Sequence, residues 1–213
     1  QQDIVKFGMA GTLTDYVLKT FKGTDVMGSA SGMYAKDPAD IINYVSKHDN
    51  ETLWDNLQFK LNPEMNNSER VRAQNISQSI VLLSQGIPFL QMGGDFLRSK
   101  SLDRNTYDAG DWYNLVDFTF ELNNWNKGLP LDKGGRNDND LVYLAASSSS
   151  TVAMTDILFA SNVFNEFLSI RSNSPLFKLT TATDIINRVG FHNTGKNQTQ
   201  GLIVMSIDDG TGF

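Results

Sequence analysis

The chain has 213 residues, a net charge of -6 and no cysteine, so disulfides and thiolate metal sites are excluded. Two histidines argue against a histidine-rich zinc site, and the lack of a basic stripe argues against a nucleic-acid partner. With 40% hydrophobic residues, the composition is that of a globular protein with room for one large domain and a small appendage.

The first part of the chain predicts a helix, a loop and a buried strand. Residues 3–19 are expected to form a helix interrupted by two glycines, and a Gly/Ser-rich loop covers residues 23–32. Asp37 has the position of an N-cap, and Pro38 that of the first helical residue, in a short helix that follows. The apolar run at 41–46 then predicts a strand.

A helix and a second strand follow this first strand. Asn66 and Glu69 have the three-residue spacing of a capping box, and Gly86 is placed to end the helix that they open. The apolar run at 87–92 predicts the second strand. Because a helical connection joins parallel strands, we expect the runs 41–46 and 87–92 to be parallel neighbours.

The remaining sequence predicts a long loop, a helix and a late strand. Residues 93–154 have no strong periodicity but are rich in polar and aromatic residues, which favours an ordered surface loop. A helix is expected over 155–171, and residues 201–207 have a strand pattern. The change of pattern predicts a domain boundary near residue 178, between domains at 1–178 and 179–213.

His48 and Asp49 stand together at the end of the first predicted strand. Such a pair can be a proton relay, a metal pair or a hydrogen-bonding clamp. The chain has only one other histidine and no Gly-x-Ser-x-Gly nucleophile elbow, which favours a clamp on a polyhydroxylated substrate. The alternative is a satisfied core histidine beside a surface aspartate.

Several sequence runs resemble one enzyme family. The run YVSKHDNETLWD at 44–55 resembles the fourth conserved region of the α-amylase superfamily, glycoside hydrolase family thirteen. Three further runs are similar to type I pullulanases, namely GIPFLQMGGDFLRSKS at 86–101, DRNTYDAGDWYN at 103–114 and NNWNKGLP at 123–130. The run VGFHNTG at 189–195 is similar to the large pullulanases of Gram-negative bacteria.

The resemblance implies an α/β fold. The expectation is the C-terminal part of a (β/α)8 barrel, with its seventh and eighth strands at 41–46 and 87–92 and the helices that belong to them. The long loop after the eighth strand would cover the active site, and the truncated start of an all-β domain, a β-sandwich, would follow at 179–213.

The resemblance also implies retaining hydrolysis of α-1,6-glucosidic linkages in pullulan, starch or glycogen-derived dextrins. Asp49 matches the third of three catalytic carboxylates and would stabilise the transition state through hydrogen bonds to the sugar being cleaved. His48 would contact the same sugar, and Asn50 would extend the polar wall. Asp103 and Arg104 are expected to contact the next glucose, with a structural ion pair as the alternative for Arg104.

The family's nucleophile and general acid lie on earlier strands, and no Gly-Phe-Arg-x-Asp-like segment occurs here. Without them, covalent catalysis and proton transfer cannot run, so the isolated chain is predicted to be inactive. Its partners would be the α-glucan substrate and the missing N-terminal part of the same enzyme, secreted or at the surface of a bacterium. The alternatives are an α-1,4-acting amylase relative and a non-catalytic carbohydrate-binding fragment.

No cofactor is expected to be required and no metal ligand is assigned. Calcium stays open because acidic residues of the long loop offer oxygen ligands, although the EF-hand spacing is absent; these are Asp108, Asp111, Asp132, Asp138 and Asp140. Aromatic residues of the same loop either stack on sugars or pack the loop; these are Tyr107, Trp112, Tyr113 and Trp125.

Overall fold

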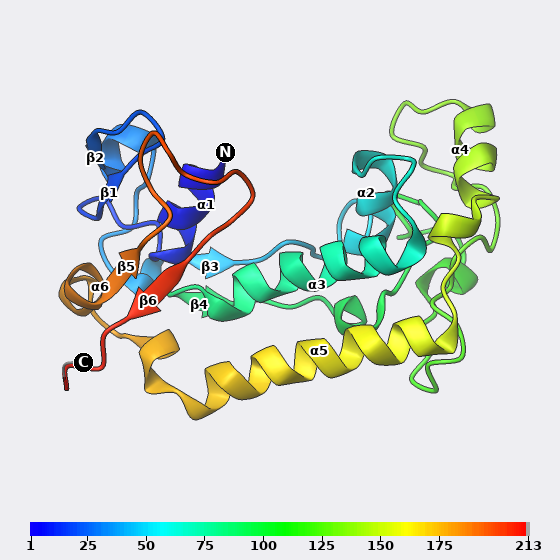
Figure 1. Ribbon diagram of the computed structural model, residues 1–213. Coiled ribbons are helices and arrows are strands. Elements are labelled where there is room, and N and C mark those ends of the chain that lie inside the picture. The colour runs from blue at the N-terminus through cyan, green and yellow to red at the C-terminus, as the bar shows by residue number, and fades with distance from the viewer. Residues whose placement is uncertain (212–213) are drawn as a thin grey trace. The chain divides into compact units, whose positions relative to one another are not determined.

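The computed structural model describes residues 1–211, which contain six α-helices and six short strands (Figure 1). The helices are α1 (Gln2–Met9), α2 (Leu53–Lys60), α3 (Asn67–Leu83), α4 (Asp138–Ala145), α5 (Met154–Asn173) and α6 (Ala182–Arg188). The strands are β1 (Val17–Lys19), β2 (Asp25–Met27), β3 (Ile42–Asn43), β4 (Ile87–Pro88), β5 (Val189–Phe191) and β6 (Met205–Ile207). Short 3-10 helices cover Gly28–Ser31, Pro38–Asp40, Gly94–Phe96, Asp111–Asn114, Ser148–Ser150 and Pro175–Lys178.

The strands pair in three separate two-stranded sheets. Strands β1 and β2 are antiparallel, as are β5 and β6, in which Val189 lies opposite Ile207. Strands β3 and β4 are parallel, with Ile42 opposite Ile87. The predicted parallel pairing of the two apolar runs is therefore confirmed.

The predicted barrel fragment is wrong. Closing a barrel requires each strand to pair on both sides, whereas each strand within residues 1–211 belongs to a sheet of only two strands. The apolar runs 41–46 and 87–92 become two-residue strands, β3 and β4. An apolar run indicates that its residues tend to be buried, but it does not fix the length of a strand. A strand extends only as far as a neighbouring strand continues the hydrogen-bonded ladder.

The chain divides into two compact units that alternate along the sequence. Unit 1 contains Gln1–Asn43, Ile80–Phe89 and Leu168–Phe213, and unit 2 contains Tyr44–Ser79 and Leu90–Phe167. The boundary predicted near residue 178 stays a prediction. No helix within the described residues has the length and apolar character needed to cross a membrane.

The core of unit 1 surrounds Tyr16, which is 5% exposed. Its ring packs edge-on against Phe7 and Phe191, and its hydroxyl donates to the Val189 carbonyl oxygen at 2.8 Å. Burial raises the pKa of Tyr16 to about 12, so this hydroxyl stays a donor. The contacts join the N-terminal segment to β5, which follows it by more than 170 residues.

Helix α1 is shorter than the helix predicted over residues 3–19, since it ends at Met9. The reason is local. Gly11 has a φ of 83° and Thr12 a φ of 56°, and a right-handed helix cannot continue through left-handed residues. The chain then turns into the β1–β2 hairpin.

The core of unit 2 is built on two tryptophans, Trp54 of α2 and Trp125 of the long loop. The Trp125 indole N–H donates to the Ala145 carbonyl oxygen at 3.1 Å, at the end of α4. Helix α4 was not predicted, because the polar residues of its first turn obscure the apolar pattern of a helix only eight residues long. The predicted capping box is confirmed, because the Glu69 amide donates to Asn66 Oδ1 at 3.0 Å and the Asn66 amide to Glu69 Oε2 at 2.8 Å.

Arg171 of α5 donates to carbonyl groups in the last turn of α3 and just beyond it. Its guanidinium donates to the Leu82 and Ser84 carbonyl oxygens at 2.9 and 2.7 Å, and to that of Gly86 at 2.9 Å. The glycine is required at 86, since its φ is 96° and a Cβ there would lie 2.6 Å from Ile41 Cγ2. One buried cation thus replaces the missing helical donors at this end of α3.

We expect Arg171→Met to destabilise unit 1 by about 3 kcal/mol, because three carbonyl groups lose a charged donor that a thioether cannot replace. Arg171→Lys should lose less, since an ammonium keeps the charge but lacks the planar fork. Urea-induced unfolding followed by circular dichroism measures both. Equal stability of Arg171→Met and the unsubstituted protein would contradict this role.

Candidate functional site

The candidate site lies in unit 2, in the turn between β3 and α2. Thr52 is the N-cap of α2, and its hydroxyl oxygen accepts from the Asp55 amide at 3.2 Å. Asn50 has a φ of 62°, a left-handed value that asparagine adopts more readily than most residues. The cap and the left-handed residue turn the chain so that His48, Asp49 and Asn50 lie on the surface.

Asp49 is the carboxylate of this turn. Its side chain is 57% exposed, and its two oxygens face the Lys47 ammonium and, at 3.3 Å, His48 Nε2. The hydrogen bond from Lys47 lowers the pKa of Asp49, and the charge of His48 acts in the same direction. Asp49 is therefore an ionised acceptor at neutral pH, open to solvent. The alternative of a buried core histidine does not hold, because the His48 side chain is 85% exposed.

Arg104 joins the long loop to this turn. It donates to Asn50 Oδ1 at 2.7 Å, and its Nε lies 3.5 Å from Glu51 Oε1. Arg136 also donates to Glu51 Oε1, at 2.8 Å, while its guanidinium lies 3.7 Å from the centre of the Phe59 ring. Glu51 is only 5% exposed and links two arginines. The structural ion pair considered for Arg104 is therefore present, and contact with a substrate stays a prediction.

Asp103 has a different environment from the other predicted site residues. It is fully buried, and its oxygens accept from the backbone amides of Asn105 at 2.7 Å, Leu131 at 2.8 Å and Asp132 at 3.2 Å. These bonds tie two parts of the long loop together. The geometry favours a structural role for Asp103, and its contact with the next glucose stays a prediction.

Two buried charged residues, Asp55 and Lys100, lie on the interior side of the turn. Neither was predicted from the sequence as a site residue. Asp55 has no exposed surface and accepts from Ser99 Oγ at 2.5 Å and from the Lys100 amide at 2.7 Å. Lys100 is 2% exposed, and its Nζ donates to the His48 carbonyl oxygen at 3.2 Å. The sequence feature that could have identified them is their position, since each lies in a run that carries the family resemblance.

The structure also bears on the hypotheses of a metal site and of aromatic residues that stack on sugars. Across residues 1–211, no group of three histidine or acidic side chains is placed to hold a metal ion, and calcium stays a prediction. Tyr113 and Trp125 are 5% and 8% exposed, so they pack the loop. Tyr107 and Trp112, at 93% and 60%, keep exposed ring surface that a sugar could cover.

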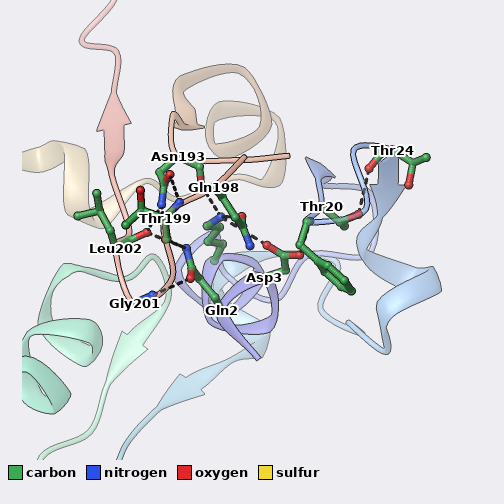
Figure 2. Close-up of polar contacts among 11 residues, drawn as sticks. Gln2, Asp3, Thr20, Thr24, Asn193, Gln198, Thr199, Gly201 and Leu202 are labelled. Carbon is green, nitrogen blue, oxygen red and sulfur yellow. Dashed lines mark hydrogen bonds and ion pairs between the residues drawn. The ribbon is translucent and has the colours of Figure 1, made fainter. Parts of the chain in front are cut away.

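A second polar cluster lies in unit 1, and Figure 2 shows Asp3, Asn193 and Gln198 within it. These three residues contact the buried Lys6. Its ammonium donates to the Asn193 carbonyl oxygen at 2.6 Å and to Gln198 Oε1 at 2.7 Å, and lies 3.4 Å from Asp3 Oδ1. The other Asp3 oxygen accepts from the Phe21 amide at 2.8 Å. Because these polar groups are hydrogen-bonded or ion-paired to one another, the cluster holds the loop near residue 198 against α1.

Comparisons with known proteins identify the relatives of this chain. Residues 120–213 match the family described as "Alpha-1,6-glucosidases, pullulanase-type, C-terminal". The pullulanase of Klebsiella aerogenes is 42% identical over 214 residues, which cover 98% of this chain and 20% of the relative. The chloroplastic pullulanase 1 of Arabidopsis thaliana is 43% identical over 216 residues, which cover 97% of this chain and 22% of the relative.

Solved structures lead to the same relatives. A crystal structure of apo pullulanase from Klebsiella pneumoniae has a TM-score of 0.92 at 41% identity, covering 99% of this chain and 23% of that chain. Another, complexed with maltotriose, has a TM-score of 0.91 at 41% identity, covering 99% and 20%. The chain is thus homologous to pullulanases and spans about a fifth of the length of its curated relatives. The match to a C-terminal family agrees with the correction of the barrel prediction.

The buried Asp55 predicts a pH dependence of stability. Burial raises its pKa from 3.8 to about 6, so the folded protein holds a proton on Asp55 at pH values where the unfolded chain has lost it. Its contribution to stability is therefore complete below pH 4 and falls by about 3 kcal/mol as the pH rises through 6.

Asp55→Asn should remove this contribution to the pH dependence, because an amide does not titrate. Urea-induced unfolding at pH 4, 5, 6 and 7 gives the difference in unfolding free energy between the two proteins. As the pH rises, the unfolding free energy of the unsubstituted protein should fall steadily relative to that of Asp55→Asn. Parallel curves over this range would mean that the pKa of Asp55 is not raised by burial.

Proposed function

Because this chain is homologous to pullulanases over nearly its whole length, we propose that it is part of a debranching glycoside hydrolase of the α-amylase superfamily. The reaction is the cleavage of α-1,6-glucosidic linkages in pullulan, starch or glycogen-derived dextrins, with retention. The observation that carries the proposal is an ionised, solvent-open Asp49 flanked by a histidine and an asparagine in one turn.

Asp49 acts on the sugar whose linkage is cleaved. A carboxylate accepts hydrogen bonds from two sugar hydroxyls, and bonds to the 2-hydroxyl strengthen as the ring approaches an oxocarbenium ion. Such bonds stabilise the transition state more than the ground state, so they raise the rate of the chemical step. The present partners of Asp49 are the surface side chains of Lys47 and His48, whose ion pairs are weak enough for substrate hydroxyls to replace.

The neighbours of Asp49 complete the grip on the substrate. The exposed His48 imidazole donates to a further hydroxyl of the same sugar, and Asn50 extends the polar surface. Arg104, which is 39% exposed and bonded to Asn50, reaches the next glucose. Asp103 acts with Arg104 at this position. Because Asp103 is buried, its role is to hold the loop in place.

The nucleophile and the general acid come from another part of the enzyme. A retaining glycosidase needs a carboxylate nucleophile and a carboxylic acid that protonates the leaving oxygen, and the sequence runs that carry them in the family do not occur here. The isolated chain therefore binds α-glucan but does not hydrolyse it, and its partner is the N-terminal part of the same enzyme. The reaction needs no cofactor, and calcium would serve the loop alone.

The proposed location of the enzyme rests on the resemblance to the large pullulanases of Gram-negative bacteria. Relatives occur in Klebsiella and, as a chloroplastic protein, in Arabidopsis. We place the present protein outside a bacterial cell or at its surface, where branched glucans that cannot enter the cell are available.

The first test is the product formed from pullulan by the full-length protein that contains this chain. Maltotriose is the expected product, because it requires cleavage of the α-1,6 linkage. An α-1,4-acting amylase relative would leave a different set of oligosaccharides. A protein that binds pullulan without releasing any product would be the non-catalytic carbohydrate-binding alternative.

The role of Asp49 is tested by Asp49→Asn in the same protein. The amide keeps the size of the side chain but loses the charge and one acceptor, so kcat should fall by about 10²- to 10³-fold with little change in KM. Asp25→Asn, at an exposed position of β2, is the matched control and should leave both constants unchanged. A kcat for Asp49→Asn within twofold of the control would exclude Asp49 from the reaction.

A further inference from the structure

Lys100 combines complete burial with a charged side chain. It is 2% exposed, and its Nζ lies 3.2 Å from the His48 carbonyl oxygen. A buried ammonium is costly unless it is hydrogen-bonded and has acidic residues nearby. Burial lowers the pKa of Lys100, while the charges of Asp55 and Asp103 act in the opposite direction. Lys100 thus lies in the interior, where two nearby acidic residues favour its charged form, against the backbone of the turn that carries Asp49.

The same residue also holds the other end of the turn. The Lys100 backbone amide donates to Asp55 Oδ2 at 2.7 Å, and the adjacent Ser99 hydroxyl donates to Asp55 Oδ1 at 2.5 Å. Ser99 Oγ in turn accepts from the Ser101 amide at 2.8 Å, which fixes the hydroxyl. Residues 48 and 55 are therefore both bonded to one short buried segment, residues 99–101.

The turn between these two attachments needs such support. Asn50 lies in the left-handed region, with a φ of 62°, and residues in that region are maintained by the structure around them. The contacts on the outer side of Asp49 come from Lys47 and His48, whose side chains are 36% and 85% exposed. Exposed side chains of this kind set a geometry weakly, so the buried attachments determine where Asp49 lies.

We propose that Lys100 is a positioning residue, whose buried ammonium holds the His48 carbonyl group so that the Asp49 carboxylate is fixed where it meets the substrate. The proposal rests on the function assigned to Asp49 above. Lys100 itself does not touch the sugar. A displacement of about 1 Å in a catalytic group costs about 10²-fold in rate. A residue that positions Asp49 without touching the sugar therefore has a large effect on the rate.

The test is Lys100→Met in the full-length protein with pullulan as substrate. The expected result is a kcat lower by about 10²-fold with KM nearly unchanged, because the lost interaction acts in the transition state. Lys100→Arg keeps a charged donor and should recover part of the lost rate. Lys60→Met, at an exposed position of α2 in the same unit, is the matched control and should keep the full rate.

A double substitution separates positioning from general loss of structure. If Lys100 acts through Asp49, then Lys100→Met added to Asp49→Asn should lower kcat by less than about threefold. A residue with a merely structural role would lower kcat by the same factor in both backgrounds, and that result would overturn the proposal. Should Lys100→Met fail to fold, Lys100→Gln, which keeps a neutral donor, carries the same comparison.

Hydrogen exchange gives a readout that does not depend on hydrolysis. Amide exchange in residues 48–52 should become faster in Lys100→Met and stay unchanged in Lys60→Met. If the unsubstituted protein releases no product from pullulan, the proposed function fails, while the exchange result still decides whether Lys100 holds the turn. If pullulan is hydrolysed and exchange in this segment does not change, the positioning role is excluded.

Discussion

The arrangement of unit 2 depends on the carboxylate of Asp55, which is buried at the start of α2. One oxygen receives the Ser99 hydroxyl and the other the Lys100 amide, so a helix and a loop more than 40 residues apart are joined at one point. An unpaired buried carboxyl group would cost several kcal/mol, so the loop must follow the path that supplies these donors. The core around Trp54 and Leu97 lies on the same two segments, and its packing reinforces the same arrangement.

Buried polar contacts of this kind give the candidate site two layers with different tasks. In the outer layer, His48, Asp49 and Asn50 are open to solvent, and the side chain of Lys47 that pairs with Asp49 is partly exposed. In the inner layer, the side chains of Asp55, Lys100 and Glu51 are buried and hydrogen-bonded or ion-paired. A group that must bind a sugar has to be accessible, while the precision of its position comes from groups that water and substrate do not reach.

Local signals in the sequence predicted local structure well. The Asn66 and Glu69 capping box formed as its spacing indicated, and the two apolar runs paired in parallel. Other predictions from the sequence were wrong. The helix expected over residues 3–19 ends at Met9 because left-handed residues follow, and helix α4 was hidden in a polar loop. The barrel assignment was wrong for a different reason, since the number and length of strands depend on which neighbours pair with them.

The sequence by itself determined the chemistry at the end of the first apolar run, since it placed a histidine, an aspartate and an asparagine in adjacent positions. It also determined the relatedness to pullulanases, because adjacent residues in several runs carry that resemblance. Only the tertiary structure decided which charged residues are exposed and which are buried. Asp49 and Asp103 are both aspartates in runs of similar character, yet one faces solvent and the other is enclosed by backbone amides. Burial and partners arise from contacts between distant segments, and no local pattern of residues specifies those contacts.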